Sequence, residues 1–401
     1  MLGPPSGGKD PPMHAGQFVF SQFLEFLPRW HLRQAIARHQ GNRRLRSFTC
    51  HDQLVVMIFA QLTFRESLRD IENCLRGFPE KLYHIGIKGT VARATLADAN
   101  QKRSWRIWAD LAEPLIAEAR ALYADQRFAL RLKDSVYAFD TTTIDLCLTL
   151  FPWYRFRRKK SAVKLHTLLD LRGNIPCFVA ITGGATHEVK LLEDLPLEAG
   201  SYYLMDRGFV DFARLYRFTR EHAFFVTRAK ENLTCRVRES RPVDKTTGLR
   251  ADQSIRLSGP LSRGKYPDLL RRVSYADPES GVHYVFLTNN FTLAASTICR
   301  LYRCRWQVEL FFKWIKQHLR IKAFFGTSKN AVKTQVWIAL CTYLLVAILR
   351  KRLKVTMSMG EMLQILSVSL FEKTPLLQAF SRDQLKNVPA ENHKQLSFLE
   401  F

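Results

Sequence analysis

Apolar residues in the first third of the chain recur at the three- and four-residue spacing of one helix face, as in residues 54–62 and 68–75. No convincing strand pattern interrupts them. Thr49 and Asp52 lie where a capping box would begin the helix of residues 54–62, with Asp in the place that Glu or Gln usually takes. We therefore predict a small all-helical domain over residues 17–125.

From Ser135 onward the pattern changes to short apolar runs with strand-like composition. The predicted strands are residues 136–140, 164–171, 177–182, 202–205 and 224–227. The first three are separated by turn signals such as Arg172-Gly173-Asn174, which favours an antiparallel meander. A helix over residues 211–221 separates the last two, as in a strand, helix, strand unit. The predicted fold is α/β with a mixed sheet.

The second half of the chain contains a polar, arginine-rich stretch between two regular regions. Residues 229–281 indicate either an inserted subdomain of short strands or a long ordered loop. A strand over residues 283–288 follows, Asn289-Asn290 ends it, and a helix runs from residue 293 to about 319. The two halves of the sheet region, residues 130–228 and 282–355, are thus expected to form one core around the insertion.

The remaining segments place the chain among non-membrane proteins. Residues 336–349 are its most apolar stretch but fall short of the roughly 18 residues that span a bilayer, so we expect a buried helix. Residues 1–16 are rich in Gly and Pro and lack the apolar region of a secretory signal, which predicts a disordered tail. Residues 356–401 are expected to be helical or partly disordered.

Charge is the unusual feature of the composition. The chain has 61 Lys and Arg against 36 Asp and Glu, a net charge of +25. Such an excess implies a polyanionic partner, and nucleic acid leads because neutralised phosphates release counterions. Basic clusters such as Arg43-Arg44 and Lys102-Arg103 in the helical domain are either DNA contacts or solvated helix faces. Eight scattered cysteines without a C-x-x-C pair favour reduced thiols over a zinc site.

Two aspartates close apolar strands. Asp140 follows the run of residues 136–139, and Asp206 follows residues 202–205. Ligands of mixed and parallel sheets collect at the carboxyl ends of strands, so both carboxylates are candidates for a site. The alternative is that each Asp only begins a turn.

A third acidic residue lies on the predicted helix of residues 293–319. Tyr302, Arg305, Glu309 and Lys316 are spaced by three, four and seven residues and therefore form one stripe. The opposite, core-facing side carries Cys304, Val308, Phe311 and Ile315. The alternative is an exposed face on which Arg305 and Glu309 form an ion pair, which contributes a few tenths of a kcal/mol.

Taken together, Asp140, Asp206 and Glu309 supply the oxygen ligands that a pair of Mg²⁺ ions needs. Two such ions, about 4 Å apart, activate a water and stabilise the leaving 3′ oxygen when a phosphodiester is cut. Phosphoryl transfer depends on this positioning more than on covalent catalysis.

With these residues the sequence resembles the bacterial cut-and-paste insertion-sequence transposases of the DDE class that carry a Tyr-Arg-Glu-Lys signature. The resemblance extends from about residue 20 to 349. Its motifs are Asp140-Thr141-Thr142, Asp206-Arg207-Gly208-Phe209, Leu287-Thr288-Asn289-Asn290, the spaced residues Tyr302, Arg305, Glu309 and Lys316, and Thr95-Leu96-Ala97-Asp98-Ala99-Asn100 in the helical domain.

The resemblance implies a ribonuclease-H-like mixed sheet flanked by helices, a β-rich insertion and an N-terminal helical DNA-binding domain. It implies that Asp140, Asp206 and Glu309 are catalytic and bind two Mg²⁺ ions, for which Mn²⁺ can substitute. Tyr302 and Arg305 would contact phosphates near the transposon end, and Lys316 the DNA backbone. The implied partners are double-stranded DNA, as terminal inverted repeats and target, and a second copy in a homodimeric synaptic complex. The implied location is the bacterial cytoplasm, at the nucleoid when DNA is bound.

Further DNA contacts are expected close to the carboxylates. A basic run follows Trp153 and Tyr154, and basic residues among aromatics suit backbone tracking with base stacking; the alternative is a solvated hairpin tip. Lys164 shares a strand face with His166 and is expected to point to the site, although a lone strand His is more often structural. The candidates are Arg155, Arg157, Arg158, Lys159, Lys160, Lys164 and Arg207.

One departure concerns the hairpin intermediate that some members use, in which a flipped base stacks on a Trp of the insertion. No Trp lies between Trp153 and Trp306. Tyr266, Tyr275 or Tyr284 could take this place, because any aromatic face can stack a base. Two other functions stay open: a catalytically silent DNA-binding relative, such as a repressor or domesticated transposase, and a metal-dependent nuclease without strand transfer.

Overall fold

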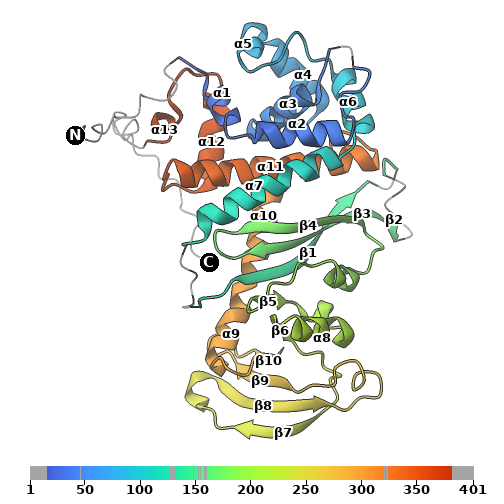
Figure 1. Cartoon of the computed structure of the whole chain (residues 1–401), viewed down its shortest axis with the longest axis vertical. Coiled ribbons are helices and arrows are strands. Elements are labelled where there is room, and N and C mark those ends of the chain that lie inside the picture. Colours follow the sequence, from blue (N-terminus) through green and yellow to red (C-terminus); the bar gives the residue numbers. More distant parts are fainter. Residues whose placement is uncertain are drawn as a thin grey trace, which may run out of the picture.

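The computed structural model describes residues 16–381, apart from residues 46, 127, 129, 131, 148, 152, 154, 158, 159, 320, 322 and 323; in residues 155–157 and 160 it describes the backbone only. The molecule is elongated: a helical region lies at one end, a sheet crosses the middle, and the strands β7 to β9 lie at the other end (Figure 1). The predicted disordered tail of residues 1–16 lies, except for Gly16, outside the described residues.

The N-terminal region is all helical, as predicted. Its elements are α1 (Val19–Leu24), α2 (Arg29–Arg38), α3 (Cys50–Leu62), α4 (Leu68–Arg76), α5 (Pro79–His84), α6 (Arg93–Lys102) and α7 (Arg106–Tyr123). The predicted capping box is confirmed: the Thr49 side chain accepts from the Asp52 backbone amide, and the Asp52 carboxylate accepts from the Thr49 amide. This exchange satisfies two amides that a helix start otherwise leaves unpaired.

The most apolar segment forms α11 (Lys329–Arg352). It is long and apolar enough to cross a bilayer, yet 89% of its most apolar window is buried inside the protein. It packs against α7 and α3, so the prediction of a buried helix is confirmed. Beyond it, α12 (Met359–Ser369) and α13 (Leu376–Ala379) lie against α1, and Val19 N donates to Glu372 O at 2.9 Å. Residues 382–401 lie outside the described part.

The sheet has ten strands and a mixed topology. They are β1 (Val136–Leu146), β2 (Arg155–Arg157), β3 (Lys160–Asp170), β4 (Ile175–Gly183), β5 (Tyr202–Met205), β6 (Phe224–Arg228), β7 (Cys235–Arg241), β8 (Leu249–Leu257), β9 (Leu270–Ala276) and β10 (His283–Thr288). The antiparallel strands β4, β3 and β1 lead to β5 and β6, which run parallel to β1. This is the predicted ribonuclease-H-like mixed sheet.

The predicted meander turns between β3 and β4 at Gly173 and Asn174, which have φ values of 83° and 57°. Such angles suit glycine and asparagine in a tight hairpin turn. A Cβ on Gly173 would lie 2.2 Å from the Tyr123 ring, so glycine is also required by the packing of α7 on this turn.

The insertion is β-rich, as the hypothesis of short strands predicts, and it is not a long loop. Its strands β7, β8 and β9 join β10 and continue the same sheet in the order β6, β10, β9, β8, β7. Every pairing in this part is antiparallel. The stretch that reads as polar in the sequence is therefore an edge of the central sheet.

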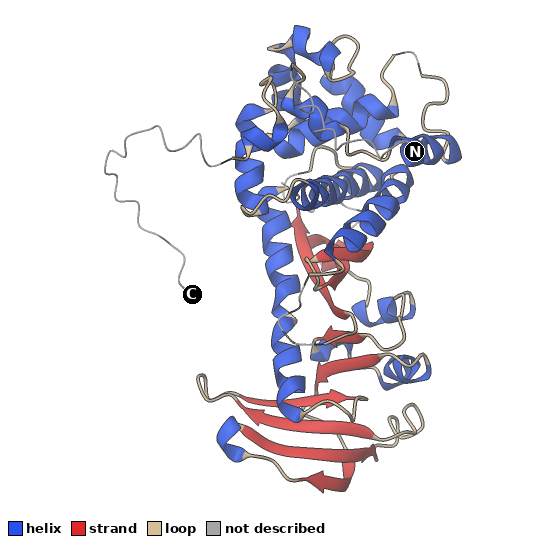
Figure 2. Ribbon diagram, turned by 60° about the vertical axis from the view of Figure 1, so that its left-hand side comes forward, coloured by secondary structure: helices blue, strands red, loops and turns tan. Residues whose placement is uncertain are grey.

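The long helix predicted over residues 293–319 is two helices in line, α9 (Ala295–Cys304) and α10 (Trp306–His318). Arg305 separates them but keeps right-handed helical angles, with φ −54° and ψ −31°. Figure 2 shows the pair as one long column that runs from the insertion strands toward the helical end. Contacts with β5, β6, β8 and β9 place α9 on the sheet, while α10 contacts β1.

Candidate active site

Asp140 lies inside a strand and not at its end, which corrects the sequence-based prediction. β1 continues to Leu146 because it pairs with β3 over ten residues. What does end near Asp140 is the parallel pairing with β5, whose last partners are Phe139 and Met205. Asp140 therefore stands at the point where two parallel strands separate, and its carboxylate accepts from the Thr141 amide at 2.7 Å.

Asp206 lies where the sequence predicts it, directly after β5. It begins the short 3-10 helix η3 (Arg207–Phe209). Because Phe139 pairs with Met205, the residues that follow each of them, Asp140 and Asp206, come from adjacent strands at the same edge of the parallel pairing. Two carboxylates are thus brought together by register alone.

Arg305 joins the first aspartate to the helical glutamate. Its Nη1 donates to Asp140 Oδ2 at 2.9 Å, and its Nη2 donates to Glu309 Oε1 at 2.5 Å. The Arg305 side chain is 13% exposed. Its buried Nε–H has no hydrogen-bond partner in the described part of the chain. This largely buried guanidinium therefore binds two carboxylates, and its Nε–H is left over as a hydrogen-bond donor.

Asp206 is held by a different cation. Arg228, the last residue of β6, donates to Asp206 Oδ1 from Nη2 at 2.8 Å and from Nε at 3.2 Å. The Tyr302 hydroxyl donates to the same oxygen at 3.2 Å. Sequence reasoning missed Arg228, although a basic residue at the end of the strand parallel to β5 was a signal that could have found it.

Lys316, the fourth residue of the helical stripe, also faces the sheet. Its Nζ donates to Thr142 Oγ1 at 2.5 Å and to Thr143 O at 3.1 Å. Thr142 is two residues beyond Asp140 and shares its face of β1. Tyr302, Arg305, Glu309 and Lys316 thus all lie on the side of α9 and α10 that meets the sheet. Of the four residues predicted to face the core, Val308, Phe311 and Ile315 are buried, whereas Cys304 is only partly buried.

The carboxylates have unequal affinities for protons. Burial raises the pKa of Asp140 to about 6, and the charges of Glu309 and Asp206 add to the rise, against the Thr141 amide and Arg305. Burial by itself would raise the pKa of Asp206 as well. The hydrogen bond from Arg228 and the neighbouring positive charges outweigh burial, so the pKa of Asp206 is lowered. Burial raises the pKa of Tyr302 to about 12, so it is a neutral donor at pH 7.

The donor set suits a hard divalent cation, since such ions prefer carboxylate oxygens. Glu309 and Asp206 both lie within electrostatic reach of Asp140, since their charges add to the rise that burial causes in its pKa. Within residues 16–381 as described, however, no three acidic, His or Cys side chains converge as a ready metal site. The oxygens that would hold an ion are bonded instead to Arg305, Arg228 and Tyr302.

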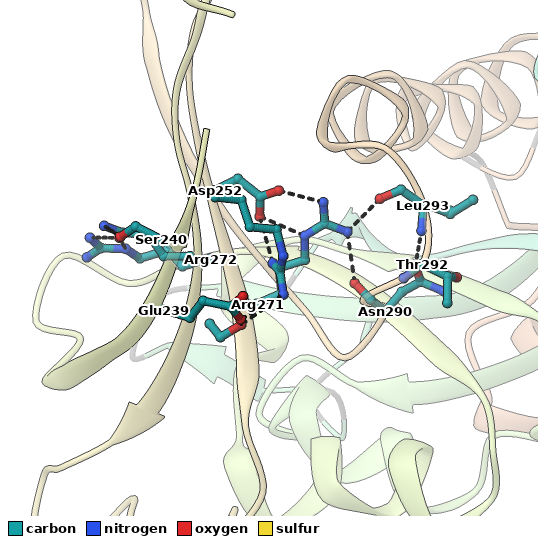
Figure 3. Close-up of polar contacts among 11 residues, drawn as sticks. Glu239, Ser240, Asp252, Arg271, Arg272, Asn290, Thr292 and Leu293 are labelled. Carbon is teal, nitrogen blue, oxygen red and sulfur yellow. Dashed lines mark hydrogen bonds and ion pairs between the residues drawn. The ribbon is translucent and has the colours of Figure 1, made fainter. Parts of the chain in front are cut away.

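A buried ion pair fixes the start of α9 to the insertion strands. Arg271 of β9 donates to both oxygens of Asp252 of β8, each at 2.8 Å, and their side chains are 3% and 7% exposed. The remaining arm of Arg271 donates to Leu293 O at 2.6 Å and to Asn290 O at 3.3 Å (Figure 3). Arg271 thereby ties the insertion to the loop from which the Tyr302 and Arg305 helix begins.

The Asn289-Asn290 motif has a structural reason. The Asn289 side chain accepts from the Phe225 amide at 2.9 Å and donates to Ala223 O at 2.8 Å, which fixes the end of β10 to the start of β6. The Asn290 side chain accepts from the Thr292 and Leu293 amides. The side chains of Asn289 and Asn290 therefore shape the turn that directs the chain from β10 into α9.

Lys164 and His166 share a strand face, as predicted, but the expectation that they point to the site is wrong. His166 pairs with Thr141, the neighbour of Asp140, and adjacent strand residues point to opposite faces. Lys164 instead forms an ion pair with Glu188 at 2.9 Å. His166 bonds Thr141 and Thr182, and burial lowers its pKa to about 4, so it is a structural, neutral histidine.

The other predicted DNA contacts are only partly visible. Of the basic run after Trp153, Arg158 and Lys159 lie outside the described residues. For Arg155, Arg157 and Lys160 only the backbone is described, in β2 and at the start of β3. Arg207 is exposed, next to Asp206, and pairs with Glu231 at 3.1 Å.

A small aromatic cavity of about 250 Å³ adjoins the site. Two of the three tyrosines singled out in the sequence line it, Tyr275 and Tyr284, together with Tyr302 and Arg305. Tyr266 does not, since its ring is fully buried and its hydroxyl bonds Thr219 at 2.6 Å. The candidates for an aromatic contact near the carboxylates are thus reduced to Tyr275 of the insertion and Tyr284 of β10.

Comparisons with known proteins give a consistent result. A family model of the transposase DDE domain matches residues 131–345, and a model of a domain of unknown function, DUF4372, matches residues 15–88. A Sinorhizobium fredii protein named as transposase y4zB is 31% identical over 69% of this chain and 77% of its own length. A Geobacillus stearothermophilus protein, named as a transposase for insertion sequence element IS5377, is 30% identical over 55% of this chain and 58% of its own.

A solved structure is similar more distantly. The cryo-EM structure of the piggyBac transposase synaptic complex with hairpin DNA has a TM-score of 0.44 and 10% identity, over 95% of this chain and 86% of that one. A similarity at this level carries no inference about the present site.

Proposed function

The chain belongs to the transposase DDE-domain family and is a transposase, and we propose that it cuts DNA at transposon ends with Asp140, Asp206 and Glu309 and joins those ends to a target. The observation that supports this best is the Arg305 fork, which links Asp140 on β1 to Glu309 on α10. These residues have no packing reason to meet as charged groups. Together with Asp206 on the neighbouring strand, they supply the carboxylate oxygens that a two-metal phosphodiester reaction would use.

We propose that these three carboxylates hold two Mg²⁺ ions, or Mn²⁺ in their place. The ions would supply a water activated at neutral pH and charge stabilisation at the leaving 3′ oxygen. For this, Asp140 must be ionised and the guanidinium of Arg305 must leave its two oxygens. Arg228 holds Asp206 in the ionised form, as its lowered pKa indicates. The chain thus keeps its acidic residues in place with its own cations before a substrate arrives.

The helical stripe fits the role of a phosphate contact. Arg305 carries a planar fork suited to phosphate oxygens, and its buried Nε–H still lacks a partner among the described residues. Tyr302 is a neutral donor at the same place. Lys316 lies farther along the helix and donates to Thr142. There its ammonium would contact a phosphate of the DNA backbone as a point charge.

The aromatic cavity next to Tyr302 supports a stacking role for the insertion. Tyr284 and Tyr275 stand on neighbouring strands as direct partners, and the ring of Tyr284 is parallel to that of Phe286, with centroids 5.8 Å apart. We propose that an unstacked base next to the cut site enters this cavity. A hairpin step would then use a tyrosine where other members of the family use a tryptophan.

The helical domain is proposed to bind the terminal inverted repeats. A groove of about 730 Å³ runs between α6 and the loop after α2 and is lined by Arg43, Arg44 and Lys102. Basic side chains along a groove bind DNA phosphates. Replacing Arg43 and Arg44 by Gln is expected to weaken binding of repeat DNA, whereas Arg69→Gln, a charge loss on the exposed face of α4, is expected to leave it unchanged.

Two further proposals come from the family resemblance: the chain acts as a homodimer that pairs two transposon ends, and it works in the bacterial cytoplasm, at the nucleoid when DNA is bound. The net charge of +25 is consistent with a polyanionic partner.

The test is an assay of the purified chain on the DNA ends that flank its own gene, with Mg²⁺ or Mn²⁺ and a target plasmid. We expect metal-dependent release of 3′ ends and joined products from the unchanged chain and from Asp194→Asn, an exposed acidic control. Asp206→Asn should bind the same DNA and release none. Cleavage without joined product would identify a nuclease, and binding without cleavage by the unchanged chain would identify a silent relative.

A further inference from the structure

A second hollow, of about 300 Å³, lies where the insertion meets the catalytic part of the sheet. It is bordered by η3, the end of β6 and the loop after it, and by β9 and β10. The polar residues around it are Arg207, Arg228, Lys230, Glu231, Arg272 and His283. Arg228, which holds Asp206, belongs to its wall, so the hollow adjoins the carboxylate site directly.

The charges around this hollow do not balance. Arg228 is paired with Asp206, which leaves three cations, Arg207, Lys230 and Arg272, against a single carboxylate of the hollow. That carboxylate, Glu231, is 92% exposed and pairs with Arg207. An ion pair so exposed is screened by water and contributes little. The bonds described for Lys230 and Arg272 are to neutral oxygens: Val210 O at 3.0 Å and the Gln253 side chain. Concave surfaces lined by one sign of charge concentrate ions of the other sign.

One cation of the hollow is held in a fixed direction. Arg272 donates from Nε to Gln253 Oε1 at 3.0 Å, across the pairing of β8 with β9. Its neighbour Arg271 points to the other face of the sheet, where it donates to Asp252 and to Leu293 O before α9 (Figure 3). Arg272 is therefore an oriented guanidinium with Nε and Nη2 on Gln253 Oε1, and its outer N–H groups would donate to a phosphate oxygen.

The hollow and the proposed base cavity are neighbours, because Tyr284 lines both of them. An anion in the hollow and an aromatic ring of the ligand in the cavity would belong to adjacent parts of one molecule. A nucleic acid strand has this alternation of phosphate and base.

We propose that this hollow, lined by Arg207, Lys230 and Arg272, binds a backbone phosphate of the DNA strand next to the cut site. The inference rests on the proposed function and deepens it: the insertion clamps the substrate strand against the catalytic part of the sheet. It assigns this surface of the arginine-rich insertion to DNA contact. The phosphate is held from both sides, by Arg207 of the core and by Lys230 and Arg272 of the insertion.

The test is the salt dependence of binding to the transposon-end DNA, measured for the unchanged chain and for Lys230→Gln and Arg272→Gln. Each lost phosphate contact lowers the slope of log K against log salt by about one. The matched control is Arg256→Gln, an exposed arginine of β8 outside the hollow, for which we expect an unchanged slope. Thermal unfolding of each variant checks its fold, and Lys230, an exposed loop residue, can be replaced without disturbing the β8–β9 pairing.

The outcomes separate the possibilities. An unchanged slope for both hollow variants, or an equal loss for Arg256→Gln, overturns the inference, while cleavage by the unchanged chain would leave the proposed function standing. Absence of DNA binding and cleavage by the unchanged chain contradicts the proposed function itself. A titration with inorganic phosphate distinguishes the source of the anion: binding of phosphate that Lys230→Gln abolishes, with no change in the DNA slope, would make this a site for free anions and overturn the clamp.

Discussion

Arg305 and Asp140 lie 165 positions apart in the sequence and form an ion pair of 2.9 Å between Nη1 and Oδ2. The same guanidinium binds Glu309 at 2.5 Å. A cation therefore already stands between two of the three carboxylates. Arg305 holds the two carboxylates in position, but it also competes with a metal ion for their oxygens. A divalent ion would have to replace the guanidinium at the carboxylates, and a phosphate would have to replace the carboxylates at the guanidinium.

We expect Arg305→Gln to bind Mn²⁺ more tightly than the unchanged chain when no DNA is present, because the competing guanidinium is gone. The same variant should lose cleavage by about 10²–10³, which is typical when a charge-stabilising donor is removed. Arg305→Lys should recover little of it, since a single ammonium cannot reach two partners as a fork does. A Mn²⁺ titration followed by electron paramagnetic resonance gives the affinity. Weaker Mn²⁺ binding by Arg305→Gln would show that Arg305 supports the ion and does not compete with it.

The raised pKa of Asp140 predicts a pH-dependent stability. The pKa is 3.8 in an exposed setting and about 6 in the fold, so the folded chain holds this proton more tightly. The unchanged chain should lose stability as the pH rises from about 4 to 6. Asp140→Asn cannot ionise, so its free energy of unfolding relative to the unchanged chain should increase over that window, by about 3 kcal/mol at most. Chemical denaturation in the presence of a chelator measures this difference; a difference that is flat with pH contradicts the assignment.

The Arg271–Asp252 pair is expected to stabilise the joint between the insertion and α9. Asp252→Asn leaves a buried guanidinium without its counter-charge, which costs about 3–5 kcal/mol. Hydrogen exchange of the β8 and β9 amides should then be faster by about 10² to 4 × 10³, since each 1.4 kcal/mol is tenfold. Asp98→Asn breaks the exposed pair with Lys102 and should change protection of α6 less than tenfold. Equal effects of the two changes would refute a special role for the buried pair.

Stacking by Tyr284 can be followed with a fluorescent base. DNA carrying 2-aminopurine next to the cut site should be quenched on binding if that base enters the aromatic cavity. Tyr284→Phe should keep the quenching, and Tyr284→Ala should lose it together with about 1–3 kcal/mol of binding free energy. Tyr83→Ala, an exposed ring of the helical domain, is the control. Quenching that survives in Tyr284→Ala would assign the base to another surface.

Much of the fold could be predicted because local signals agreed with the tertiary structure. The bounds of β5 and β10 match the predicted strands, since apolar runs end there at Asp206 and at Asn289, both turn formers. The end of β1 could not be predicted in the same way. Asp140 reads as a turn former, but the threonines that follow it suit a strand, and pairing with β3 carries that strand six residues further.

The carboxylates could be predicted as a set, whereas their partners could not. Helical spacing places Arg305 next to Glu309, but only the packing of α10 against β1 shows that Asp140 is within its reach. Arg228 and Arg271 escape sequence reasoning because each acts through a residue more than 15 positions away. Lys164 was misplaced for the same reason, since its face depends on the register with β1.

The most direct test of the three-carboxylate site is anomalous diffraction from crystals of the chain with transposon-end DNA and Mn²⁺. We expect manganese peaks about 2.1 Å from carboxylate oxygens of Asp140, Asp206 and Glu309, with the Arg305 guanidinium moved onto a phosphate. Manganese bound elsewhere while Arg305 still joins Asp140 to Glu309 would contradict the proposed active site.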